Sequence, residues 1–284
     1  MAFKTLKEIA EAAESAKIPF WQAVLNDDCE ENGLDSKKSL QKMKEMFAVM
    51  QDTVKKYNPT EVSESGLSGT DGDKFAKYSS SGKSISGSLM SRMIEIALKT
   101  AEANACMHRI VACPTAGSCG VLPSVLIPLF ERGEASEEEC VHALITAAGI
   151  GKIIAANASI AGAEGGCQAE IGSASAMAAG ALTELRGGST EQIIASVGFA
   201  LQNLMGLVCD PVGGLVEIPC VKRNVVGCVN AVSCADMSLA GIKPHIPCDE
   251  TISAMASVGR LMSQDLRETG RGGLAATQTA RSFF

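Results

Sequence analysis

Three cysteines, each in a segment marked by glycine or proline, are the residues of this chain best suited to carry chemistry. Cys167 lies in Gly-Gly-Cys-Gln-Ala-Glu, Cys209 in Val-Cys-Asp-Pro, and Cys220 in Ile-Pro-Cys-Val-Lys. Thiolates are preferred ligands of soft metals and iron–sulfur clusters. Three thiolates would leave one iron of a [4Fe–4S] cube without a protein ligand, and an open iron can polarise a substrate oxygen. The set therefore indicates a candidate dehydratase.

A second interpretation is that these cysteines are small buried hydrophobes, as most free cysteines are. That interpretation suits the three cysteines in turns less well than the cysteines that lie within helical patterns. The cysteines within helical patterns are Cys29, Cys106, Cys140, Cys228 and Cys234. The compact spacings of zinc sites are absent from the sequence. Cys113 and Cys119 remain rival cluster ligands, and we rank them below the three in turns.

A Pro-Thr turn with two glycines, residues 113–120, leads into an apolar helical pattern. Such a turn can aim backbone N–H groups and hydroxyls at an anion, for instance a carboxylate. Thr115 and Ser118 are its hydroxyl residues. The alternative is an ordinary loop at the start of a helix.

Two further segments carry polar residues beside the cysteines or near the C-terminal end. Asn157, Ser159 and Glu164 precede Cys167, although Asn and Ser are also common caps and turn formers. In the glycine-rich stretch 267–274, two arginines, one of them Arg271, suit bidentate binding of a carboxylate. The alternative is a pair of solvated basic residues near a helix end.

Helical patterns dominate the elements that must position these residues. Apolar residues recur at i, i+3 and i+4, and no run shows sustained alternation. We expect helices over residues 3–15, 20–31, 36–56, 88–104, 122–131, 136–155, 168–185, 190–207, 224–240 and 249–266. Ser36 is the expected N-cap of the third, and acids follow the serines at 136 and 189. The fold class is predicted to be all-α, a compact multi-helix domain with buried helices rich in small residues.

Residues 63–87 change character, because Ser and Gly crowd this stretch among scattered Asp and Lys residues. We expect a polar loop between two helical parts. The expected organisation is an N-terminal helical segment, residues 1–60, followed by a catalytic helical domain, residues 61–284, which together form one continuous domain.

Composition narrows the classes of function. The chain has 284 residues, 46% of them hydrophobic but only 4% aromatic, so a large core must be built from aliphatic side chains. The net charge of −7 and the lack of a Lys/Arg block argue against a nucleic-acid partner. The uncharged span 110–130 is interrupted by three prolines and two glycines, which argues against a membrane helix. Residues 1–15 do not resemble a secretory signal, and the odd count of eleven cysteines suggests a reducing cytoplasm.

Together these segments resemble the alpha chain of the iron–sulfur-dependent L-serine dehydratases. The resemblance covers the sequence from about residue 65 onward and is carried by residues 65–69, 81–87, 109–117, 157–170, 209–214, 218–224 and 267–275. It implies a [4Fe–4S] cluster on Cys167, Cys209 and Cys220 with one open iron. It also implies a separate beta chain and an oligomer. Because the chain ends in Phe283-Phe284, we expect no terminal cysteine as a fourth ligand.

The resemblance further implies deamination of L-serine to pyruvate and ammonia. Lys74, Lys83, His108 and Glu164 are the candidate acid/base residues. The candidate substrate-binding residues are Thr115, Ser118, Asn157, Ser159, Arg223 and Arg271. Two alternatives remain open: a related cluster-dependent lyase acting on L-threonine or L-cysteine, and a non-catalytic iron–sulfur protein.

Overall fold

The computed structural model describes residues 3–284, and within this range the chain forms thirteen α-helices and no sheet. The prediction of an all-α fold is confirmed. The helices are α1 Leu6–Ala16, α2 Phe20–Asn32, α3 Ser36–Lys55, α4 Asp71–Ser80, α5 Gly87–Ala105, α6 Val121–Glu131, α7 Glu137–Asn157, α8 Gly162–Gly165, α9 Ser173–Leu185, α10 Thr190–Leu204, α11 Cys220–Leu239, α12 Cys248–Leu261 and α13 Gln278–Arg281.

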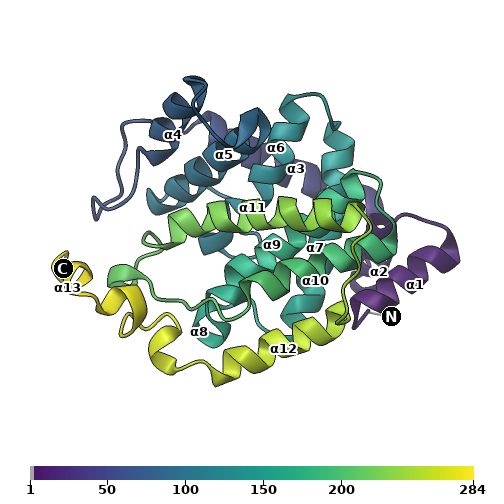
Figure 1. The fold of residues 1–284 in the computed structure, drawn as a ribbon. Helices are drawn as coiled ribbons and strands as arrows, with labels where there is room; N and C mark the ends of the chain where they lie inside the picture. The colour runs from purple at the N-terminus through teal and green to yellow at the C-terminus, as the bar shows by residue number, and fades with distance from the viewer. Residues whose placement is uncertain (1–2) are drawn as a thin grey trace.

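Helix α9 lies at the centre of the bundle, packed between α7, α10 and α11 (Figure 1). Its sequence is rich in Ala, Ser and Gly, and every residue from Ser173 to Thr183 is buried. A methyl group on Gly180 would lie 2.3 Å from the Ile150 Cδ1 atom of α7. Small side chains therefore let the neighbouring helices approach this one closely, and aliphatic residues fill the remaining space.

The N-terminal helices α1 to α3 pack against the rest of the bundle. Helix α2 contacts α7, α1 contacts α10, and α3 contacts both α5 and α7. Leu6, Phe20 and Phe47 belong to the same buried core as Ile150. Residues 1–60 thus share a core with the rest of the chain, apart from Met1 and Ala2, which lie outside the described residues; the boundary at residue 60 stays a prediction.

Helix α7 is the one helix of residues 3–284 long and apolar enough to cross a membrane. However, 67% of its most apolar stretch is buried inside the protein, and it contacts α9, α2 and α3. These are the properties of a core helix in a globular protein.

Predicted helix starts at Ser136 and Ser189 are confirmed. The hydroxyl of each serine accepts a hydrogen bond from the backbone three residues later, and the side chain of Glu139 or Gln192 bonds back. The N-cap of α3 is Asp35 rather than the predicted Ser36, because the Asp35 carboxylate accepts the Lys37 N–H at 3.0 Å.

The prediction of a loop over residues 63–87 was wrong for its middle part, which forms α4. The buried Glu102 of α5 accepts the N–H groups of Asp71 and Gly72 at 2.8 and 2.9 Å, so a residue distant in sequence caps this helix. Phe75 packs against the small cluster of Leu98, Ala101 and Val221. The cap and the packing of Phe75 both involve residues that are distant in sequence, so the local Ser- and Gly-rich pattern could not indicate them.

Candidate active site

The three cysteines singled out from the sequence come from different elements and lie in one region. Cys167 joins α8 to the π-helical turn Gln168–Gly172, Cys209 lies in the loop after α10, and Cys220 is the first residue of α11. Their exposed fractions are 2%, 3% and 8%. Burial raises the pKa of Cys167 to about 11 and that of Cys220 to about 12, and it also raises the pKa of Cys209. The negative charge of Cys167 adds to the shift at both Cys209 and Cys220, so the thiols are within electrostatic reach of one another.

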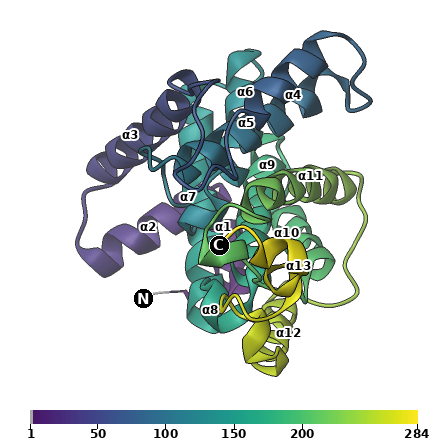
Figure 2. The same ribbon diagram turned by 90° about the vertical axis from the view of Figure 1, so that its left-hand side faces the viewer.

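Backbone hydrogen bonds join the segments that carry the thiols. The Gln168 N–H donates to the Leu207 carbonyl at 2.9 Å, which ties the Cys167 turn to the Cys209 loop. The Cys209 N–H donates to the Leu266 carbonyl at 2.8 Å, and the Glu268 N–H donates to the Cys209 carbonyl at 2.7 Å. The C-terminal segment, yellow in Figures 1 and 2, therefore pairs with the Cys209 loop.

Asp210, the residue after Cys209, anchors this pairing. It is 3% exposed and accepts hydrogen bonds from the Arg223 guanidinium at 2.9 Å and from the Leu274 N–H at 2.8 Å. Gly273 has a φ of +59°, and a methyl group there would lie 2.4 Å from the Asp210 Oδ2 atom. Only glycine can adopt this positive φ without strain and also leave room for the Asp210 carboxylate.

Arg223, predicted to bind substrate, is bonded to protein groups around the thiols. Besides Asp210, its guanidinium donates to the Val208 carbonyl at 2.7 Å, and its positive charge acts on the Cys167 thiol and partly offsets the rise in the pKa of that thiol. Its contacts therefore hold the Cys209 loop and Cys167 together. Its assignment to substrate binding stays a prediction.

The predicted anion-binding turn at Thr115 and Ser118 lies beside the thiols. The Thr115 hydroxyl donates to the Glu170 Oε1 atom at 2.8 Å, and Glu170 Oε2 lies 3.9 Å from the Cys209 Sγ atom. Burial raises the pKa of Glu170, although the Thr115 hydroxyl partly offsets the effect. Glu170 thus connects the hydroxyl turn to the thiol region.

Asn224 fixes the same turn to α11. Its amide group donates to the Gly117 carbonyl at 2.9 Å and accepts the Gly120 N–H at 2.8 Å. It also donates to the Cys220 carbonyl at 3.0 Å. The sequence analysis did not assign roles to Glu170, Asp210 or Asn224, although each lies within four residues of a cysteine and in a segment that carries the family resemblance.

Asn157, Ser159 and Glu164 lie together in a separate polar pocket with Arg260 of α12. The Ser159 hydroxyl donates to Glu164 Oε2 at 2.7 Å, and the Asn157 amide donates to the Lys4 carbonyl at 2.8 Å. None of the three cysteines lines this pocket. The sequence predicted these polar groups to lie beside a cluster on Cys167, and that position and their roles stay predictions.

The remaining charged candidates are exposed. Lys74 of α4 pairs with Asp71 at 3.0 Å, Lys83 lies in the turn between α4 and α5, and Arg271 pairs with Asp265 at 3.1 Å. The structure gives none of them a contact with the three cysteines among the described residues.

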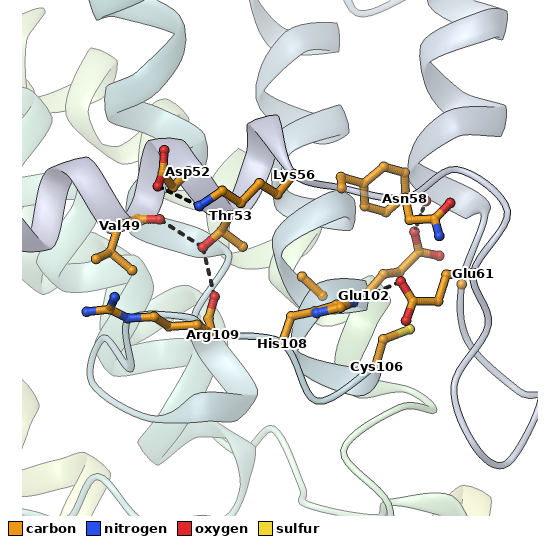
Figure 3. Close-up of a pocket in the computed structure, with 13 residues that line it drawn as sticks. Val49, Asp52, Thr53, Lys56, Asn58, Glu61, Glu102, Cys106, His108 and Arg109 are labelled. Atoms are coloured by element: carbon orange, nitrogen blue, oxygen red, sulfur yellow. Dashed lines mark hydrogen bonds and ion pairs between the residues drawn. The ribbon is translucent and has the colours of Figure 1, made fainter.

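His108 lies in another pocket, between α3 and α5 (Figure 3). Its Nε2 atom is 2.8 Å from the Glu61 carboxylate, and Cys106, Glu102 and Asp52 also line the pocket. The lining includes none of the three predicted cluster cysteines. A role for His108 in acid/base chemistry stays a prediction.

Within residues 3–284, no three His, Cys, Asp or Glu side chains are placed to hold a single metal ion. The donor set of Cys167, Cys209 and Cys220 is nevertheless soft and buried, and its members interact electrostatically. A methyl group on Gly162 would lie 2.9 Å from the Cys209 Sγ atom and 2.7 Å from Glu170 Oε2. The backbone of α8 therefore packs directly against the Cys209 thiol and the Glu170 carboxylate, with no room for a side chain at position 162.

Comparison with known proteins identifies the family. The serine dehydratase alpha chain family matches residues 15–275. A protein of Bacillus subtilis named "Probable L-serine dehydratase, alpha chain" is 46% identical over 99% of this chain and 94% of its own length. The "L-serine dehydratase, alpha chain" of Peptoniphilus asaccharolyticus is 39% identical over 98% of this chain and 96% of its own length.

A longer relative, the "L-serine dehydratase" of Helicobacter pylori strain 26695, is 36% identical over 96% of this chain but only 58% of its own length. The matched region of that protein is thus accompanied by further sequence. The similarity to the two alpha chains runs through all the segments that build the thiol region. The chain therefore belongs to the serine dehydratase alpha chain family, as the sequence predicted.

Proposed function

We propose that this protein deaminates L-serine to pyruvate and ammonia with an iron–sulfur cluster held by Cys167, Cys209 and Cys220. The observation that carries the proposal is the convergence of three buried thiols with the Glu170 carboxylate and the Thr115 turn. Relatives of nearly the same length are named L-serine dehydratase alpha chains, which supports serine as the substrate.

The donor set supports a cluster better than a single ion. The cysteines of a cluster bind different iron atoms, so their thiols lie farther apart than the ligands of one ion. Thiols that come from three different elements and interact electrostatically fit this requirement. When bound, a [4Fe–4S] cluster with one open iron would supply Lewis acidity toward the β-hydroxyl group of the substrate.

The protein's own groups would bind and orient the amino acid. We assign its carboxylate to the backbone N–H groups of the turn at Thr115 and Ser118, because the Thr115 hydroxyl already donates its proton to Glu170. Glu170 is a positioning residue, because it accepts the Thr115 proton and so fixes the direction of that hydroxyl. Lys74, Lys83, His108 and Glu164 stay the predicted acid/base candidates.

The reaction balances without an external oxidant or reductant. Loss of the α-proton and of the β-hydroxyl group as water forms the Cα–Cβ double bond of aminoacrylate. Aminoacrylate tautomerises to an imine, and one water molecule hydrolyses the imine to pyruvate and ammonia. The burial of the thiols excludes bulk water from the side of the site that they form.

We assign the reaction to the cytoplasm and to an assembly with a separate beta chain. All eleven cysteines are free, which agrees with a reducing compartment. The names of the Bacillus and Peptoniphilus relatives describe alpha chains, which supports a second chain and an oligomer.

The test is an anaerobic assay of the protein after incubation with iron and sulfide, alone and with the candidate beta chain. We expect broad visible absorbance, about four irons and four sulfides per chain, and pyruvate formation from L-serine that exposure to air abolishes. Pyruvate formation by the protein freed of iron, or a preparation that retains activity in air, would contradict the proposal.

A further inference from the structure

The motif at residues 63–69, which the proposed function leaves without a role, is bound to the segment that leads into Cys220. The buried Glu217 carboxylate accepts the Ser63 hydroxyl at 2.6 Å and the Ser65 hydroxyl at 2.9 Å. The Ser63 N–H donates to the Ser68 carbonyl at 2.8 Å and closes the motif into a tight loop. Glu217 is 5% exposed, so this clamp of a carboxylate and two hydroxyls is shielded from water.

Val216, the residue before Glu217, contacts a different part of the molecule. A methyl group on Gly117 would lie 3.4 Å from the Val216 Cγ1 atom and 3.1 Å from the Glu170 Oε1 atom. Val216 and Glu170 therefore both lie next to Gly117 in the predicted anion-binding turn. Val216 remains 38% exposed, although it is a large apolar side chain. The Glu217 clamp holds the residue that follows Val216. The Val212 N–H donates to the Ile218 carbonyl at 2.9 Å and closes the loop that contains Val216.

The proposed function places the substrate next to Val216. Its carboxylate would lie at the Thr115 turn and its β-oxygen would point toward the thiols. The carbon atoms between these groups would then pass Gly117 and the Val216 side chain beside it. A β-methyl group, which distinguishes threonine from serine, would compete with the Val216 side chain for room.

We propose that Val216, held by the clamp of Glu217 with Ser63 and Ser65, is the residue that determines the preference for serine over threonine. The inference rests on the proposed function and deepens it. An apolar wall discriminates against an added methyl group through steric contact, and one such group typically changes kcat/KM at least about tenfold.

The experiment compares kcat/KM for L-serine and L-threonine in the cluster-loaded protein with its partner chain. Pyruvate and 2-oxobutanoate are the respective products. We expect Val216→Ala to raise the ratio of threonine to serine activity by about tenfold, and Val216→Ile to lower it. Val226→Ala, on an exposed valine of α11, is the matched control and should leave the ratio unchanged.

A second variant tests the clamp. Glu217→Gln should raise the ratio of threonine to serine activity, but by less than Val216→Ala does. The visible spectrum of the cluster should stay that of the wild type. An unchanged ratio in both Val216 variants, with an active wild type, would overturn this inference and leave the proposed function intact. A loaded wild-type assembly that converts neither amino acid would overturn both.

Discussion

The thiol region and the His108 pocket both gather ionisable side chains, but they are built in different ways. In the thiol region, Asp210 and Glu170 each bond two segments that are distant in sequence, and Asn224 bonds the turn at Gly117 and Gly120. In the His108 pocket, the histidine makes one carboxylate contact and its side chain is 53% exposed. The difference teaches that a candidate site is recognised by how firmly its residues are held, and less by how many can ionise.

The largest expected effect is the loss of the cluster in Cys167→Ala, Cys209→Ala or Cys220→Ala. Each removes one of three thiols that would bind iron, so we expect iron and sulfide content and pyruvate formation to fall to background. Cys113→Ala is the matched control, since Cys113 is similarly buried at 6% exposure but bonds within its own turn. A full cluster in any of the three variants would show that the ligand set is wrong.

Glu170→Ala should have the next largest effect. It leaves the Thr115 hydroxyl without its acceptor, so we expect KM for L-serine to rise about tenfold, with the visible spectrum unchanged. Glu170→Gln keeps an acceptor oxygen and should restore most of the affinity. Asp52→Asn in the His108 pocket serves as the control. If Glu170→Ala changed only kcat, the positioning role would be refuted.

Asp210→Ala should destabilise the fold, because it leaves the Arg223 guanidinium, whose side chain is only 13% exposed, without its charged partner. We expect the free energy of unfolding to fall by about 3 kcal/mol. Asp265→Ala removes the partner of Arg271 in an exposed pair and should change it by less than about 1 kcal/mol. Denaturant titrations of both variants measure the contrast, and equal losses would argue against the anchoring role of Asp210.

The smallest expected effect concerns His142, which stacks on Trp21 with ring centroids 3.6 Å apart. Burial lowers its pKa from the usual 6.5, although Glu138 and Glu139 oppose the shift. The unfolded chain therefore binds a proton more readily than the folded one between the two pKa values. The contribution of neutral His142 to the stability of the fold is therefore complete above about pH 6.5, and it is lost as pH falls through the lowered pKa.

The denaturant midpoints of the wild type and of His142→Phe, compared at pH 7.5 and 5, test whether acidification destabilises the fold through His142. The wild type should lose more stability on acidification than the variant, whose ring cannot be protonated. A larger loss in the variant would contradict the pKa direction.

The sequence predicted the features that depend on local patterns. The capping boxes at Ser136 and Ser189 and the apolar small-residue helices arise from side chains within a few positions of one another. Helix α4 could not be predicted, because its cap is Glu102, thirty residues away. The cysteines stood out because turn residues flank them, whereas Asp210 and Asn224 act through partners that only the fold brings near.

The pairing of Cys209 with the C-terminal segment sets an order for biosynthesis. The peptide groups of Cys209 bond to Leu266 and Glu268, and its neighbour Asp210 bonds to Leu274. Because the chain is synthesised from its N-terminus, these partners are joined more than fifty residues after Cys209. The Cys209 loop therefore reaches its final form only once the segment from Leu266 to Leu274 has been made and can pair with it.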